Sequence, residues 1–249
     1  MTSPSDILKG KTALITGSNR GIGKAITEKF AENGADILAC VRKESVEFLA
    51  FIRELSNKHG VIIKTVYFDL SDETQIKESL SFLIRNKVPI DILVNNAGIH
   101  HKGLLQMTPI SKIKEVFEVN FFAQLKIIQL ISRIMMHRKS GNIINIASAS
   151  GIESYPGYSA YGTSKAALLY ATQVLAKELA PYNIRVNAIA PGLTDTDMLK
   201  ELDQEAVKSM LCDGSVKNVN SASEVAEIAL FLASDLSSDT NGQIIRLEK

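Results

Sequence analysis

The sequence predicts an α/β protein: a single doubly wound domain in which a seven-stranded, mainly parallel sheet is flanked by helices. Short apolar, β-branched runs alternate with longer helical patterns along the whole chain. This alternation is typical of parallel strands joined by right-handed helical crossovers, with helices on both faces of the sheet. With 249 residues, 45% of them hydrophobic, the chain can bury a large core, and no repeat or low-complexity linker divides it. We therefore expect one domain over residues 1–249.

The strands are expected at the short apolar runs. The first run, at 12–16, ends at a glycine turn, and a helical pattern follows it. The other strands are expected at 36–41, 62–68, 91–94, 141–147, 185–189 and 243–247. Helices fill the intervals, and the two longest are expected over 112–138 and 159–180. The polar stretch 215–223 is expected to be a loop and not a domain boundary.

Composition excludes several classes of protein. The net charge is +1 and the basic residues are dispersed, which argues against a nucleic-acid groove or a polybasic membrane patch. The longest apolar stretch, 127–136, is interrupted by polar residues, and residues 1–6 lack a hydrophobic signal core. Two cysteines, Cys40 and Cys212, indicate no disulfide framework and favour a reducing cytoplasm. The four histidines show no metal-ligand spacing, so we expect no metal site.

A glycine-rich turn follows the first strand directly and opens the first helix. Glycines permit a tight turn and a close backbone approach to a pyrophosphate, and the helix N-terminus offers unpaired N–H groups. The spacing Gly-x-x-x-Gly-x-Gly departs from the usual Gly-x-Gly-x-x-Gly fingerprint, and an ordinary strand-to-helix turn is the alternative. The candidate cofactor-binding residues in this turn are Gly17, Ser18, Asn19, Arg20, Gly21, Ile22 and Gly23.

Tyr161, Lys165 and Ser148 form a candidate proton-transfer device. A helix starting near residue 159 places Tyr161 and Lys165 on one face, one turn apart. A free phenol titrates near ~10, and a neighbouring ammonium is expected to lower that pKa. Ser148 ends an apolar run, so its hydroxyl can hydrogen-bond a substrate oxygen in a cleft. These groups suit reversible proton transfer to a carbonyl or carbinol, although a Tyr four residues before a Lys also occurs by chance.

The charges at the end of the second strand favour NADPH as the cofactor. An NAD site usually has an acid there, which binds the ribose 2′-hydroxyl. Here Val41 occupies that position, Arg42 follows, and Arg20 lies in the glycine turn. Two guanidinium groups suit a 2′-phosphate. In the alternative interpretation, Arg42 and Lys43 begin a solvated helix face, and the Glu44 carboxylate weakens the site.

Several motifs share an order and spacing along the chain. They are Thr16 to Gly23, Asn95-Asn96-Ala97-Gly98, Asn120, Ser148, Tyr161-x-x-x-Lys165 and Pro191-Gly192. Together they resemble the short-chain dehydrogenase/reductase family, over about residues 8 to 247. Segments 145–151 and 190–198 look like the bacterial 3-oxoacyl-acyl-carrier-protein reductases of that family. The resemblance implies a Rossmann-type domain that binds NADP(H), with a substrate lid near 193–222.

The same resemblance implies roles for individual residues. Asn120 would complete a catalytic tetrad with Ser148, Tyr161 and Lys165 by holding a water, and Lys165 would also bind the nicotinamide ribose. A core amide satisfied by backbone is the alternative for Asn120, and a stretch that contains a helix N-cap is the alternative for Asp69. The implied cofactor contacts are Asp69 and Leu70 at the adenine, Asn96, Ala97 and Gly98 at the ribose, and Pro191, Gly192 and Thr194 at the nicotinamide.

The expected reaction is hydride transfer from NADPH to a carbonyl while Tyr161 donates a proton to the developing alkoxide and Ser148 binds that oxygen. The resemblance implies 3-oxoacyl thioesters of fatty-acid synthesis as substrates, a homotetramer, and an acyl-carrier-protein partner that docks on Arg138, Lys139 and Lys177. Solvated helix residues are the alternative for these three cations. The alternatives are a sugar or secondary-metabolite alcohol or ketone dehydrogenase, and a non-catalytic NADP-binding regulatory protein. Segment 212–219 differs from the lid of those reductases. His100 and His101 are expected on a loop surface, with substrate contact as the alternative.

Overall fold

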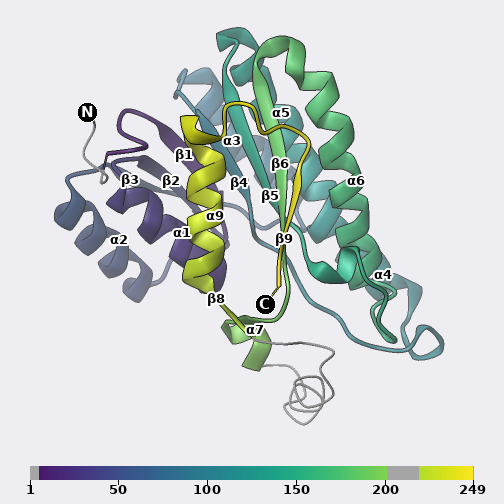
Figure 1. Ribbon diagram of the computed structural model, residues 1–249. Coiled ribbons are helices and arrows are strands. Elements are labelled where there is room, and N and C mark those ends of the chain that lie inside the picture. Colours follow the sequence, from purple (N-terminus) through teal and green to yellow (C-terminus); the bar gives the residue numbers. More distant parts are fainter. Residues whose placement is uncertain (1–5, 201–218, 249) are drawn as a thin grey trace.

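Seven parallel strands form the central sheet in the computed structural model of this chain, which describes residues 6–200 and 219–248 (Figure 1). The strands lie in the order β3-β2-β1-β4-β5-β6-β9. Their bounds are Thr12–Thr16 (β1), Asp36–Val41 (β2), Ile63–Tyr67 (β3), Ile92–Asn95 (β4), Gly141–Ile146 (β5), Ile184–Pro191 (β6) and Ile244–Leu247 (β9). The chain builds outward from β1 to β3 and then returns to β4 on the other side of β1. The order therefore reverses between β1 and β4.

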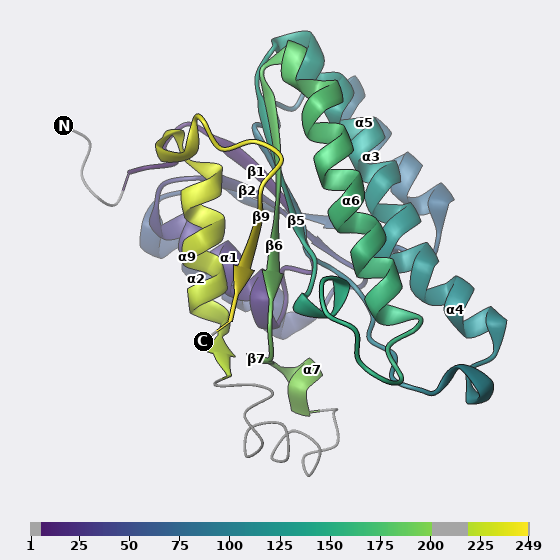
Figure 2. The same cartoon turned by 45° about the vertical axis from the view of Figure 1, so that its right-hand side comes forward.

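Helices cover both faces of this sheet (Figure 2). One face carries α1 (Gly21–Glu32), α2 (Val46–His59) and α9 (Ala222–Ala233). The other carries α3 (Glu73–Arg85), α4 (Ile110–Phe117), α5 (Ala123–Arg138) and α6 (Tyr161–Leu179). The short elements β7 (Thr194–Asp195), α7 (Asp197–Lys200) and β8 (Asn220–Ser221) follow the carboxyl end of β6 or precede α9.

Two buried clusters, one on each face, form the core. Alternate residues of a strand point to opposite faces, so Ala13 and Ile15 of β1 pack toward α1 while Leu14 packs toward α3 and α5. Both clusters draw apolar side chains from the strands and from the helices that cover them, as expected for a parallel sheet covered on both sides. This burial fixes the strand register and holds the carboxyl ends of the strands at one edge.

The sequence-based fold is confirmed. All seven expected strands are present, with bounds that differ from the expected ones by no more than two residues. The helix expected over 112–138 begins at Ile110 and contains one π-helical turn, Glu118–Phe122, between α4 and α5. A π turn carries one extra residue and occurs often at functional sites. Asn120 lies at its centre.

Two expectations fall partly or wholly on residues that the structure does not describe. The segment 212–219, including Cys212, lies outside the described residues except for its last position, and the proposed lid near 193–222 is described only at its two ends. Cys40 lies buried in β2. Within the described ranges, no helix combines the length and the apolar character that a membrane crossing requires.

Candidate functional site

The glycine turn after β1 forms a cradle that stays open because its glycines have no side chains. Gly17 and Gly21 have φ of 71° and 52°, which favour glycine. A Cβ on Gly23 would lie 2.1 Å from the carbonyl oxygen of Gly17. The turn therefore keeps backbone exposed at the start of α1, where the first N–H groups of the helix lack intrahelical partners. Its shape and polarity fit the pyrophosphate of a dinucleotide.

The segment after β4 is fastened to this turn by Thr16. The hydroxyl of Thr16 accepts hydrogen bonds from the backbone N–H groups of Asn96 at 2.9 Å and Ala97 at 3.0 Å. The Asn96 side chain donates in return to the carbonyl of Thr16 at 2.8 Å. These hydrogen bonds hold the glycine turn and residues 96–98 together at the point where the strand order reverses.

Asn95 has a different role from its neighbours. Its amide donates to the Asn145 side chain at 3.0 Å, and Asn145 donates to Thr172 of α6 at 2.9 Å. All three side chains are buried. This polar chain crosses from β4 through β5 to α6, so Asn95 stabilises the centre of the sheet.

The carboxyl ends of β2 and β3 bring charged residues together. The Arg42 guanidinium lies 4.0 Å from the carboxylate of Asp69. Burial raises the pKa of Asp69, but hydrogen bonds from Ser71 and the charges of Arg42 and Lys43 outweigh it, so the net shift is downward. The N-cap of α3 is Asp72, which accepts from two backbone N–H groups. The stretch thus contains the helix N-cap, as the alternative expected, but the cap is Asp72, while Asp69 lies beside Arg42 and Leu70 is buried.

Ser148, Tyr161 and Lys165 converge where β5 ends and α6 begins. The side chains of Ser148 and Tyr161 share a hydrogen bond. Ser148 also accepts from the backbone N–H of Ser150 at 3.2 Å. Lys165 lies one helical turn beyond Tyr161, with its Nζ 5.9 Å from the centre of the Tyr161 ring and 2.8 Å from the carbonyl oxygen of Ile146.

The expected lowering of the Tyr161 pKa is not what the structure gives. Burial raises the pKa of Tyr161 to about 12, although the hydrogen bond with Ser148 opposes the rise and Tyr158 adds to it. Burial also lowers the pKa of Lys165 to about 8. The Lys165 ammonium donates to the carbonyl of Ile146, and its charge does not offset the desolvation of the phenol. Tyr161 is consequently protonated at neutral pH and is placed to donate a proton.

Asn120 is completely engaged by its surroundings. Its side-chain oxygen accepts from the N–H of Ile99, and its nitrogen donates to the carbonyl of Ile99, each at 2.9 Å, and to Ser164 at 3.1 Å. The interpretation as a satisfied core amide is therefore correct. A Cβ on Gly98 would lie 2.9 Å from the Asn120 oxygen and 3.6 Å from the Lys165 Nζ. Asn120 and Lys165 thus border the same glycine, which is compatible with the tetrad.

His100 lies against Tyr161, a contact that the sequence interpretation did not favour. The centres of the two rings are 4.8 Å apart, and Tyr158 lies 5.5 Å from His100. Tyr155 continues this aromatic group at 5.8 Å from Tyr158. His100 and His101 lie on the loop after β4, as expected, and both are half-buried, so the ring contact of His100 with Tyr161 is what the sequence did not show. These rings form an aromatic wall beside Tyr161, and the sequence signal for it was the spacing of three residues between Tyr155, Tyr158 and Tyr161.

The segment after β6 closes the other side of the site. The N–H of Gly192 donates to Leu247 of β9, and the hydroxyl of Thr194 donates to Gly192 at 3.1 Å. A Cβ on Gly21 would lie 3.2 Å from Thr196, so this segment packs on the glycine turn. Pro191, Gly192 and Thr194 therefore share one edge of the sheet with the cradle. Among residues 6–200 and 219–248, no group of three or more His, Cys, Asp or Glu side chains could hold a metal ion.

Known proteins resemble this chain over nearly its whole length. The profile of a family described as short chain dehydrogenase matches residues 11–207. A 3-oxoacyl-[acyl-carrier-protein] reductase FabG of Thermotoga maritima is 38% identical over 242 residues, 97% of each chain. A 3alpha-hydroxysteroid dehydrogenase of Mediterraneibacter gnavus is 34% identical over 244 residues, again 97% of each. A solved structure from Beutenbergia cavernae, a putative NAD(P) dependent gluconate 5-dehydrogenase with bound NADP, has a TM-score of 0.90 at 30% identity, covering 99% of this chain and 98% of that one.

Replacement of Lys165 by Met should stabilise the folded protein at neutral pH. Burial shifts the Lys165 pKa from 10.5 to about 8, which at about 1.4 kcal/mol for each pKa unit is a penalty of about 3 kcal/mol on the charged form. Loss of the hydrogen bond to Ile146 offsets about 1 kcal/mol of the gain. We expect Lys165→Met to melt at a higher temperature than the wild type at pH 7.

The advantage of this variant should shrink with rising pH. The folded-state pKa lies below the unfolded one, so the unfolded chain binds more protons between them, and Lys165 contributes stability as pH rises from about 8 to 10.5. The variant lacks that gain. Thermal unfolding followed by circular dichroism at pH 7 and pH 10 measures both effects, and a constant difference in melting temperature would contradict the buried ammonium.

Proposed function

The chain belongs to the short-chain dehydrogenase family, and on this premise we propose that it is an NADPH-dependent carbonyl reductase that converts 3-oxoacyl thioesters to 3-hydroxyacyl thioesters in fatty-acid synthesis. The observation that carries this proposal is the buried pair of Tyr161 and Ser148 at the end of β5, with the cradle of α1 on the same edge. The identity of 38% to a 3-oxoacyl-acyl-carrier-protein reductase supports the substrate.

The residues present fit NADP(H). The glycine cradle suits the pyrophosphate, Arg20 lies in this turn, and Arg42 follows β2, where Val41 replaces the acid of an NAD site. The structural neighbour with bound NADP supports the same cofactor. NADPH, when bound, supplies the hydride that reduces the carbonyl carbon. The adenine is assigned to Asp69 and Leu70, the ribose to Asn96, Ala97, Gly98 and Lys165, and the nicotinamide to Pro191, Gly192 and Thr194.

Tyr161 acts as the proton donor in this proposal. Its pKa of about 12 keeps the phenol protonated at neutral pH, so donation to an alkoxide, the reductive direction, needs no prior ionisation. Ser148 hydrogen-bonds the substrate oxygen, where stabilisation counts most as negative charge develops. Lys165 binds the ribose and adds a positive field near this oxygen, and Asn120 holds the Ile99 backbone beside it.

A second candidate is a dehydrogenase for another secondary alcohol or ketone. The hydroxysteroid dehydrogenase with 34% identity supports it, as do the aromatic rings of His100 and Tyr158, because both lie next to the ring of Tyr161. A non-catalytic regulatory role fits less well. It gives no reason to keep Tyr161, Ser148 and Lys165 buried together, since a buried ammonium costs stability.

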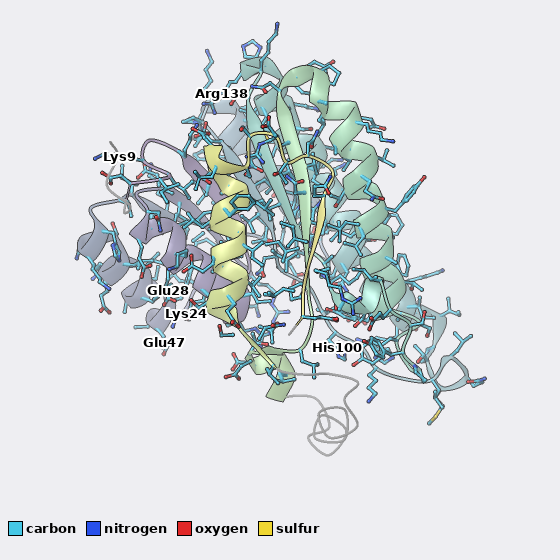
Figure 3. All side chains as sticks on the ribbon, in the orientation of Figure 1. Lys9, Lys24, Glu28, Glu47, His100 and Arg138 are labelled. Atoms are coloured by element: carbon cyan, nitrogen blue, oxygen red, sulfur yellow. The ribbon has the colours of Figure 1, made fainter. Side chains whose placement is uncertain are left out.

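The proposed carrier-docking cations lie far from the site. Figure 3 places Arg138 at the opposite end of the molecule from His100. Arg138 is also engaged by Asp91 at 2.7 Å, which weighs against it as a docking residue. Lys177 is about 24 Å from Tyr161 along α6, at about 1.5 Å for each residue. An acyl carrier protein bound at Lys177 and Lys139 would thus sit at the far end of the helix from Tyr161 of the same chain.

We also propose a cytoplasmic homotetramer. Large apolar side chains are exposed along the outer helices, with 52% of Phe122 and 71% of Tyr170 accessible. Phe122 ends the π-helical turn before α5, and Tyr170 lies in the middle of α6, so apolar surface is exposed beside both of these long helices. A symmetric partner would cover it.

The proposed substrate is tested by the rate of NADPH absorbance loss with a 3-oxoacyl thioester. We expect rapid loss with NADPH and slow loss with NADH under the same conditions. A ketosteroid and a keto-sugar acid serve as competing substrates in parallel assays. NADPH binding without thioester turnover, combined with turnover of either competitor, would assign the enzyme to the second candidate.

Tyr161→Phe should abolish most turnover and leave NADPH binding intact, because it removes the donated proton and little else. General acid catalysis contributes about 10²- to 10⁴-fold, and we expect a loss of kcat in that range. Tyr158→Phe is the matched control, since its ring lies 6.2 Å from that of Tyr161 in the same aromatic group. The mechanism is wrong if Tyr161→Phe retains wild-type turnover or if both variants lose it equally.

Arg42→Ala should weaken NADPH far more than NADH. Hydrogen bonds to a charged group contribute about 1.5 to 3 kcal/mol, so we expect NADPH to bind about ten- to hundredfold more weakly, with little change for NADH. Fluorescence titration of the two cofactors measures both constants. Lys43→Ala, the adjacent exposed cation, is the control for a general loss of charge. Equally weakened binding of the two cofactors in Arg42→Ala would contradict the proposed contact between Arg42 and the 2′-phosphate.

A further inference from the structure

One carboxylate stands among the cations that follow β2. Residues 42–45 connect β2 to α2 and contain Arg42, Lys43 and Glu44, all of them exposed. An acid in this region has two consequences for a dinucleotide: it repels a 2′-phosphate, and it can accept a hydrogen bond from a 2′-hydroxyl. An unrestrained Glu44 would therefore shift selectivity from NADPH toward NADH.

The structure restrains this carboxylate through Tyr67. The hydroxyl of Tyr67 donates a hydrogen bond to Oε2 of Glu44 at 3.1 Å. Tyr67 is the last residue of β3 and pairs in register with Val41, the last residue of β2. Its ring packs on the buried cluster under α1 and α2, so a strand and a core cluster hold the donor in place. The bond ties a loop carboxylate to the rigid sheet.

The second carboxylate near these cations is restrained as well. Oδ1 of Asp69 accepts from the N–H of Ser71 at 2.9 Å and from its hydroxyl at 2.7 Å. Its other oxygen lies 4.0 Å from the Arg42 guanidinium. Arg42 thus faces Asp69, whereas Glu44 faces Tyr67. The two acids near Arg42 each have a fixed hydrogen-bond donor.

We propose that Tyr67 is a specificity-determining positioning residue: by holding Glu44 it keeps this carboxylate from pairing with Arg42, which faces Asp69, and so favours NADPH over NADH. This inference rests on the proposed NADPH specificity of the site. Tyr67 acts through Glu44 and touches neither the substrate nor the reacting atoms. Because the tyrosine lies at an edge strand, its hydroxyl can be removed without creating a cavity in the core.

A double-mutant cycle tests the proposal, with wild type, Tyr67→Phe, Glu44→Gln and the double variant. The probes are NADPH and NADH, together with adenosine 2′,5′-bisphosphate and adenosine 5′-monophosphate, which need no substrate. Tyr67→Phe should weaken the two 2′-phosphorylated ligands about two- to fivefold, the range of an exposed charge interaction, and leave or improve the other two. Glu44→Gln should bind the 2′-phosphorylated ligands at least as tightly as wild type. On the Glu44→Gln background, Tyr67→Phe should have no further effect.

Two outcomes would overturn the role of Tyr67. One is an unchanged ratio of 2′-phosphorylated to unphosphorylated ligand affinity in Tyr67→Phe. The other is an equal loss with and without Glu44, which would mean that Tyr67 acts through packing. The wild-type ratio of NADPH to NADH affinity tests the proposed cofactor separately: preference for NADH would contradict that proposal. The coupling energy between Tyr67 and Glu44 comes from the adenosine 2′,5′-bisphosphate affinities of the four proteins, so it does not depend on the NADPH-to-NADH ratio.

Discussion

The pairing of β1 with β4 is the contact on which the site depends. Ala13, Leu14 and Ile15 pair with Ile92, Leu93 and Val94, and the reversal of strand order at this point places two turns side by side at one edge. Thr16 then joins them through its hydroxyl, and the would-be Cβ of Gly17 lies 2.9 Å from the Asn96 amide. Nothing larger than glycine fits there without displacing Asn96. The backbone that would contact a cofactor is exposed because the strands leave no room for side chains.

Burial has opposite effects on the stability and the chemistry of the site. Tyr161 and Lys165 are 9% and 5% exposed, and each is shifted toward its neutral form. For the phenol this favours the protonated form but makes it a weaker acid. For the lysine it weakens the charge that would assist. The Lys165 ammonium remains the dominant form below pH 8, however, because its lowered pKa lies above neutrality. A site of this kind trades stability for pre-organised polarity.

Sequence patterns predicted most of the fold, and the structure brings the residues of the predicted site to one edge of the sheet, for physical reasons. Buried strands have a strong periodic signature, and the glycine turn marks backbone that must come close to a neighbour. The pattern at 112–138 looked like one helix because a π turn preserves helical character, so the π turn around Asn120 left no signal in the sequence. The pKa of Tyr161 was predicted with the wrong sign. Spacing places Lys165 near the ring, but only the fold shows that its Nζ donates to Ile146 and that burial dominates.

The contacts of His100 and Glu44 show why the remainder needed a structure. His100 meets Tyr161 across 61 positions of sequence, and Glu44 meets Tyr67 across 23. No local period links such residues, because sheet register and crossover geometry bring them together. The sequence could only note that Glu44 stands beside Arg42 and weakens a phosphate site. In the fold the same carboxylate accepts a hydrogen bond from the neighbouring strand, so the charge that a phosphate meets depends on where each side chain is held as well as on which residues are present.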